Sequence, residues 1–122
     1  EVPFSNLSYY ATDPRGGAAL ANSWRVTSDV IEARTYRFAY RVGSELATWA
    51  GAGAYNDPDM LLGSSPGAAR TLSPAQSRTQ FNLWAILMAP LLLGADLTAL
   101  TGFDLHTYSN EEVLAVSQDP LC

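Results

Sequence analysis

The chain has 122 residues, of which 48% are hydrophobic and 16% are charged, a composition typical of one soluble globular domain with a real core. Its net charge of −5 argues against nucleic acid or an anionic membrane as a partner. The single cysteine, Cys122, excludes a disulfide within the chain and, with only one histidine present, leaves no transition-metal spacing, so neither a metal nor a cofactor is expected.

Residues 1–17 contain turn-forming residues and little apolar mass. Turns are favoured at Pro3, Asp13-Pro14 and Gly16-Gly17, which predicts an irregular loop region over 1–17. A loop of this length is usually either a binding loop or a disordered end, and both interpretations stay open. The domain proper is expected over 18–122.

The remaining residues alternate short apolar runs with amphipathic segments. Phe38, Val42 and Leu46 recur at helical spacing on one face, which predicts a helix. Ser73-Pro74, with Gln76 three residues after the serine, is the pattern of a capping box that opens another helix. We expect strands at 18–25, 54–58 and 91–95, helices at 35–49 and 73–88, and two short helices within 102–118. Repeating strand–helix units favour parallel strands with right-handed crossovers.

Polar side chains follow each predicted strand. Arg25 and Asp29 follow the first strand, Asp57 and Asp59 the second, and Asp96 the third. Because the carboxyl ends of parallel strands meet at the same edge of a sheet, these side chains are candidates for an active site. On spacing alone, Asp29 could instead cap the following helix beside a surface arginine. Asp96 is expected to be a structural hydrogen-bonding partner.

Four sequence blocks carry a resemblance to a known family. They are Asn22-Ser23-Trp24-Arg25 with Asp29, Asn56-Asp57-Pro58-Asp59-Met60-Leu61, Leu83-Trp84-Ala85-Ile86 with Ala89-Pro90-Leu91, and Val116-Ser117-Gln118-Asp119-Pro120-Leu121. In this order they resemble the C-terminal part of the catalytic barrel of glycoside hydrolase family 27, the α-galactosidase (melibiase) family. The resemblance implies an α/β fold comprising strands six to eight of a TIM (β/α)8 barrel, incomplete on its own.

The resemblance also implies roles for individual residues. Asp29 would be the general acid/base, and Arg25 would bind a sugar hydroxyl and keep the surroundings of the acid positive. Asp59 and Met60 would line the pocket for the terminal sugar, with Asp57 just behind them. Trp24 is a candidate for stacking on sugar, and burial against it, opposed by Arg25, would set the proton affinity of Asp29. Trp49 and Trp84 lie in helical stripes and are expected in the core.

A retaining glycosidase needs two carboxyl groups about 5–5.5 Å apart. The family motif with the nucleophilic aspartate, which belongs to an earlier strand, is absent from the sequence, and Cys122 stands where the family usually has glycine. We therefore expect a fragment of a longer enzyme that is inactive alone and needs the remainder of the barrel for folding. The resemblance suggests a secreted or extracytoplasmic location.

Two functional hypotheses remain open from the sequence. The chain is either part of a hydrolase that removes terminal α-D-galactosyl or related residues, or a non-catalytic carbohydrate-binding domain that retains the pocket without the nucleophile. Members of the family accept α-galactose, α-N-acetylgalactosamine, β-L-arabinopyranose or isomaltose units. The loop that would select among these sugars is expected within residues 2–17.

Overall fold

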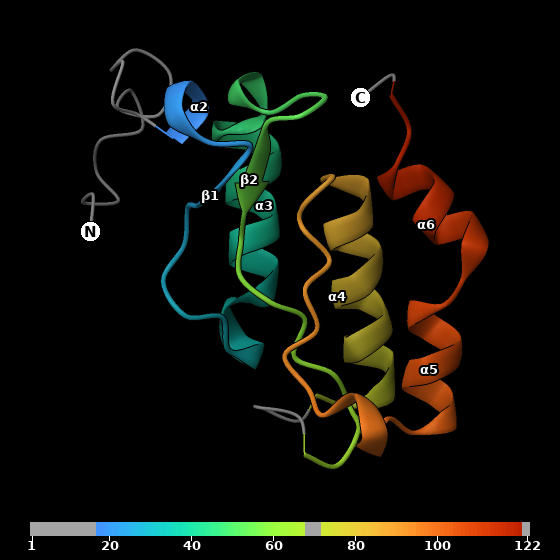
Figure 1. Cartoon of the computed structure of the whole chain (residues 1–122). Helices are drawn as coiled ribbons and strands as arrows, with labels where there is room; N and C mark the ends of the chain where they lie inside the picture. Colours follow the sequence, from blue (N-terminus) through green and yellow to red (C-terminus); the bar gives the residue numbers. More distant parts are fainter. Residues whose placement is uncertain (1–16, 68–71, 121–122) are drawn as a thin grey trace.

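A computed structural model describes residues 17–67 and 72–120 (Figure 1). The predicted loop region 1–17 lies outside the described residues, except for Gly17. The helices and strands are α2 (Gly17–Leu20), β1 (Ser23–Arg25), α3 (Thr35–Glu45), β2 (Tyr55–Asp57), α4 (Pro74–Ile86), α5 (Gly102–Tyr108) and α6 (Glu111–Ser117). Single 3-10 turns lie at η1 (Glu32–Arg34), η2 (Ala47–Trp49) and η3 (Leu97–Ala99).

Strands β1 and β2 pair in parallel, as predicted for two strands joined by a helix. In their register Trp24 lies beside Asn56 and Arg25 beside Asp57. The third predicted strand, 91–95, is wrong in extent, because it is reduced to one parallel bridge between Leu61 and Leu93. Asp59 and Gly63 on either side of Leu61 have positive φ angles of 85° and 76°, so the ladder cannot extend along this segment.

The strand predicted over 18–25 is also wrong in its first half, where the chain forms α2. Residues 18–21 are alanine and leucine, which favour a helical turn, and the Ala21 amide donates to the Gly17 carbonyl at 2.9 Å. Glycine is required at position 17 because a Cβ atom there would clash with the ring of Trp24. Only Ser23–Arg25 remain extended.

Helix α4 begins as the sequence predicts. The Ser73 side chain accepts from the Gln76 amide at 3.3 Å, and the Gln76 side chain accepts from the Ser73 amide at 2.9 Å. The helix ends at Ile86, before Met88, which has a positive φ of 50°. The predicted helix 35–49 likewise ends early, at Glu45, and continues as η2. The two short helices expected within 102–118 are confirmed as α5 and α6, and Asn110 caps α6.

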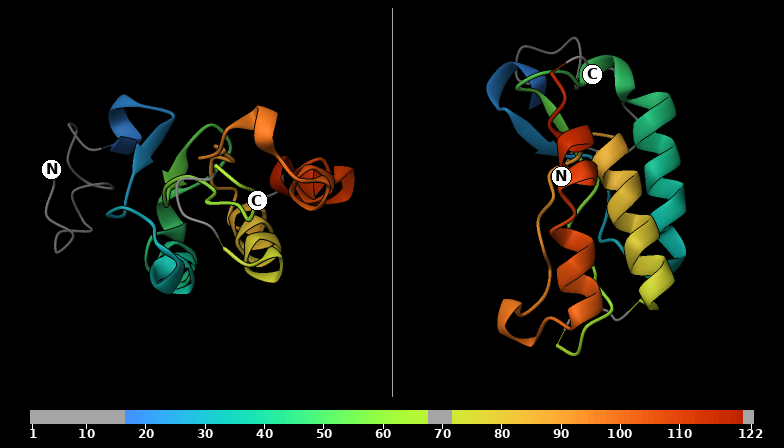
Figure 2. Two further views of the ribbon diagram at one scale, coloured as in Figure 1. Left: turned by 90° about the horizontal axis from the view of Figure 1, so that it is seen from below. Right: turned by 90° about the vertical axis from the view of Figure 1, so that its right-hand side faces the viewer.

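Helices α3 and α4 lie side by side on one side of the strands, and α5 and α6 pack against α4 (Figures 1 and 2). One buried cluster surrounds Phe81 and Trp84 of α4, as predicted for Trp84. A second cluster joins Trp24 and Val26 of the β1 segment to Val42 and Leu46 at the end of α3, with Trp49 packed against it. The hydrophobic layer between strands and helices therefore fixes one face of the short sheet.

A buried carboxylate ties the loop after β2 to α4 and α5. Asp104 is fully buried and accepts hydrogen bonds from the Ser64 amide at 2.8 Å, the Ser64 hydroxyl at 2.7 Å, the Ser65 hydroxyl at 2.5 Å and the Ser77 hydroxyl at 2.9 Å. Burial acts to raise the pKa of Asp104, but the hydrogen bonds from Ser65, Ser64 and Ser77 outweigh it and hold the pKa below its ordinary value.

The substitution Asp104→Asn should destabilise the full-length protein by about 1 to 3 kcal/mol at neutral pH, because hydroxyl donors would lose their charged acceptor. A lowered folded-state pKa contributes stability above the unfolded-state pKa, and this contribution is lost as pH falls through the folded-state value. The difference in thermal midpoint between the two proteins should therefore be largest at pH 7 and shrink at pH 3. Glu112→Gln, at an exposed carboxylate of α6, is the control. Equal midpoints at pH 7 would contradict this role for Asp104.

Candidate active site

The two faces of β1 differ in what they contact. Trp24 packs toward α3, and its indole donates to the Asn56 side chain at 3.1 Å. The Asn56 amide in turn donates to the Leu46 carbonyl at 2.9 Å. Since side chains alternate along a strand, Arg25 points away from this layer. The structure thus places Trp24 in the core at 8% exposure and does not bring it to the site predicted around Arg25.

The turn after β1 holds Asp29 in the open. Its side chain is 91% exposed, so the expected burial of Asp29 against Trp24 is wrong. Asp29 does not cap the next helix either, because its Oδ1 atom accepts from Arg25 and the described caps of η1 and α3 have no side-chain bond. Arg34 supports the turn from the helix side by donating to the Asp29 carbonyl at 3.3 Å.

The segment after β2 is held in place by side chains of α4. Trp84 donates from its indole nitrogen to the Asp59 carbonyl at 2.7 Å. The Gln80 side chain accepts from the Leu62 amide at 2.9 Å and donates to the Met60 carbonyl at 3.4 Å. Both α4 side chains are fully buried. The helix therefore satisfies backbone groups of this segment that the single bridge to Leu93 leaves unpaired.

One guanidinium group joins the ends of β1 and β2. The Arg25 Nη2 atom lies 2.7 Å from Asp59 Oδ2 and 3.3 Å from Asp29 Oδ1. The Asp59 side chain is 8% exposed, whereas the Asp29 side chain is open to solvent. Asp57, paired with Arg25 in the strand register, accepts from the Asp59 amide at 2.8 Å. The structure thus brings together four of the predicted residues, Arg25, Asp29, Asp57 and Asp59.

Met60 borders this group and is 39% exposed. Its side chain lies against Gly94, where a Cβ atom would clash with the methionine sulfur. Sequence reasoning did not single out Gly94. The signal that could have found it is a glycine in the apolar run 91–95, since a glycine inside a strand often marks the close approach of another group.

Other candidates lie outside the group. Asp96 is exposed and caps η3, where the side-chain and backbone hydrogen bonds from Thr98 lower the pKa of Asp96, consistent with the structural role expected for it. His106 is exposed on α5.

Within residues 17–67 and 72–120, no three histidine, cysteine or acidic side chains form a possible metal cluster. The same part of the chain has no helix that is long and apolar enough to span a bilayer.

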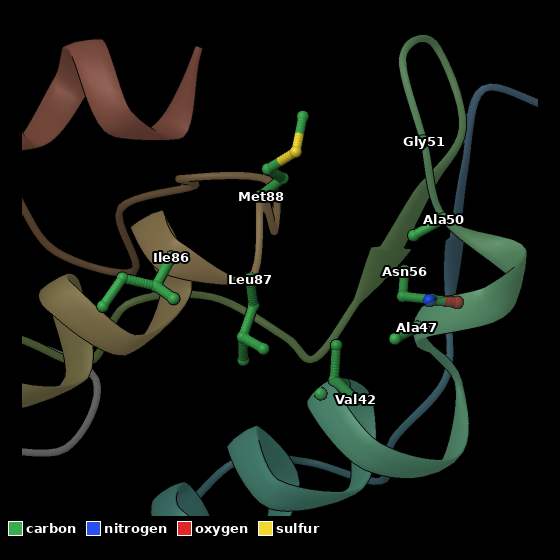
Figure 3. Close-up of a pocket in the computed structure, with 9 residues that line it drawn as sticks. Val42, Ala47, Ala50, Gly51, Asn56, Ile86, Leu87 and Met88 are labelled. Atoms are coloured by element: carbon green, nitrogen blue, oxygen red, sulfur yellow. The ribbon is translucent and has the colours of Figure 1, made fainter. Parts of the chain in front are cut away.

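Two cavities lined by residues of the described ranges lie away from this group. One of about 240 Å³ opens between the C-terminal ends of α3 and α4 and is lined largely by Val42, Ala47, Ile86, Leu87 and Met88 (Figure 3). Another of about 650 Å³ lies at the amino ends of the strands, beside Ser23, Tyr55 and Leu91. Arg25 and its carboxylate partners line neither of these two cavities.

Comparison with known proteins gives a consistent set of relatives. A family model described as "Alpha galactosidase A" matches residues 1–119. Alpha-galactosidase 3 of Arabidopsis thaliana is 37% identical over 103 residues, which are 84% of this chain and 23% of that protein. The alpha-galactosidase of Cyamopsis tetragonoloba is 35% identical over 120 residues, 97% of this chain and 28% of that protein. The chain spans about a quarter of the length of these curated relatives.

Solved structures of similar fold come from the same group of enzymes. Alpha-galactosidase I of Mortierella vinacea matches with a TM-score of 0.75 and 26% identity, over 88% of this chain and 32% of that chain. A GH27 β-L-arabinopyranosidase of Geobacillus stearothermophilus matches with a TM-score of 0.72 and 25% identity, over 96% of this chain and 28% of that chain.

The contact between Gly94 and Met60 can be tested by Gly94→Ala. The added Cβ should displace the Met60 side chain and cost the full-length protein about 1 to 3 kcal/mol of stability, measured by urea unfolding. Adding Met60→Ala should restore much of this loss, because it removes the two nearest atoms, the Met60 sulfur and Cγ, and leaves only the Leu61 carbonyl oxygen at 3.1 Å. The control, Gly102→Ala, meets no atom within 4 Å and should leave stability unchanged or raise it. A Gly94→Ala protein as stable as the wild type would contradict the contact.

Proposed function

This chain belongs to the α-galactosidase family whose model covers residues 1–119, and we propose that it supplies the general acid/base of a retaining glycoside hydrolase. In this proposal the chain corresponds to strands six to eight of a TIM barrel, with the nucleophile on an earlier strand. The substrate would be an oligosaccharide or glycoconjugate ending in α-D-galactose or a related sugar. The names of the relatives, most of them alpha-galactosidases, support this class of substrate.

The observation that carries the proposal is the arrangement of two carboxylates around Arg25. A general acid must reach the bridging oxygen of the substrate, and Asp29 is 91% exposed at the carboxyl end of β1. Its neighbour Asp59 is buried and ion-paired, at 2.7 Å from Arg25 Nη2. Asp29 is therefore the member of the pair that a bound glycoside could contact.

The proposed reaction has two steps. A carboxylate from outside this chain forms a bond to the anomeric carbon while the bond to the leaving oxygen breaks, and Asp29 gives its proton to that oxygen. Water then attacks the anomeric carbon, the carboxylate leaves, and Asp29 takes a proton from the water. Asp29 must stay in one position through both steps, beside the leaving oxygen and about 5–5.5 Å from the attacking carboxylate.

The neighbours of Asp29 would position the sugar. Arg25 is a fixed cation with several donors and can bind a sugar hydroxyl beside the acid. Met60 offers a half-exposed apolar wall, and Asp57 lies behind the segment that carries it. Trp24 is left out of this set because it is buried against α3.

In the full-length protein, Asp29→Ala should lower kcat/KM for an α-galactoside by about 10²- to 10⁴-fold, since proton transfer at the leaving oxygen is lost. The rate is measured with an unactivated galactoside, which needs the proton. Asp96→Ala, at an exposed carboxylate outside the group, is the control and should leave the rate unchanged. Binding of galactose with no turnover by the wild type would favour the alternative of a non-catalytic carbohydrate-binding domain, and an active Asp29→Ala variant would overturn the assignment.

A further inference from the structure

Asp59 has the closer contact with the arginine of the site, yet it is the less accessible carboxylate. We propose that Asp59 is a positioning residue, which acts on the substrate through Arg25 and Asp29 and does not itself bind the sugar. This inference rests on the proposed function and differs from the resemblance, which implies that Asp59 lines the sugar pocket.

The carboxylate of Asp59 is already occupied by donors within the chain. Its Oδ2 atom accepts from Arg25 Nη2 at 2.7 Å and from the Val30 amide at 2.7 Å, and its Oδ1 atom accepts from the Met60 amide at 2.8 Å. The side chain is 8% exposed. Three of the roughly four acceptor sites of the carboxylate are therefore filled, and its low exposure leaves little of the remaining site accessible to a sugar hydroxyl.

Hydrogen bonds also fix the backbone of Asp59. Its φ angle is 85°, a left-handed conformation that is uncommon for residues other than glycine, although aspartate tolerates it better than most. The amide donates to Asp57 Oδ1 at 2.8 Å, and the carbonyl accepts from the Trp84 indole at 2.7 Å. Every polar atom of Asp59 thus has a partner, and these partners come from β1 and the turn after it, from β2 and the segment after it, and from α4.

Two of those partners control Asp29. Val30, whose amide is bound by Asp59, is the residue next to Asp29, so this bond fixes the turn on which Asp29 stands. Arg25 is shared unequally, since its Nη2 atom is 2.7 Å from Asp59 and 3.3 Å from Asp29. Because the two carboxylates compete for one guanidinium, loss of charge at Asp59 should turn Arg25 toward Asp29. A fully paired Asp29 is a poorer proton donor to the leaving oxygen.

The test compares Asp59→Asn with the wild type in the full-length protein on two galactosides. One has a dinitrophenyl leaving group, which departs as a stable anion, and the other a methyl leaving group, which needs a proton. If Asp59 acts through the acid, kcat/KM on the methyl galactoside should fall by about 10²-fold or more and kcat/KM on the dinitrophenyl galactoside, whose first step needs no proton, by less than about tenfold. A residue that binds the sugar directly would lower kcat/KM equally for both substrates and weaken inhibition by free galactose. That pattern would overturn the proposal.

A double-mutant cycle separates positioning from general structural damage. Arg25→Gln should cost much less in the Asp59→Asn background than in the wild type, because both changes act through the same contact. Losses in kcat/KM that simply add in the double variant would contradict a shared contact between Arg25 and Asp59. Should Asp59→Asn fail to fold, Asp59→Glu, which keeps the charge and moves the carboxylate relative to Arg25, decides: a loss in kcat/KM that is larger on the methyl galactoside supports the proposal, and an equal loss on both substrates overturns it. If Asp29→Ala keeps full activity, the proposed function itself fails, which is a different outcome from an Asp59→Asn variant with equal losses.

Discussion

The Arg25 guanidinium group lies between one buried and one exposed carboxylate, and the rest of the site depends on these two contacts. Arg25 reaches the buried Asp59 at 2.7 Å and the exposed Asp29 at 3.3 Å. An exposed pair such as Arg25 with Asp29 contributes little to stability, because water screens it. The closer, partly desolvated pair is better placed to join the ends of β1 and β2. The contact therefore leaves one acid accessible while using the other to hold the arginine.

Several parts of the fold are needed to place this one side chain. The parallel register sets Arg25 beside Asp57, and the packing of Trp24 and Val26 on α3 turns Arg25 to the other face. On the β2 side, Trp84 and Gln80 of α4 bind the backbone of residues 59–62. Apolar packing of the strands and the following segment on α3 and α4 thus determines the geometry of the polar groups at the strand ends, as is usual for α/β folds.

Periodicity and capping signals in the sequence predicted α3, α4, α5 and α6 and the parallel pairing of β1 with β2. Predictions from local sequence were wrong at two segments whose secondary structure depends on tertiary packing. The apolar run at 18–21 forms a helical turn against Trp24, and the run 91–95 is held by a single bridge because Asp59 and Gly63 interrupt its partner. Sequence reasoning found the grouping of Arg25, Asp29, Asp57 and Asp59, but the placement of Trp24 in the core and the buried hydroxyl donors around Asp104 depend on contacts between distant residues. No spacing rule covers such contacts.

The role of Asp29 as the proton donor is best tested by a crystal structure of the full-length protein, carrying Asp29→Asn, with an uncleaved α-galactoside bound. We expect the residue at position 29 to lie within hydrogen-bonding distance of the bridging oxygen, Arg25 to remain paired with Asp59, and Met60 to border the sugar ring. A glycoside bound away from the carboxyl ends of β1 and β2, or one whose bridging oxygen is beyond reach of position 29, would contradict this role of Asp29.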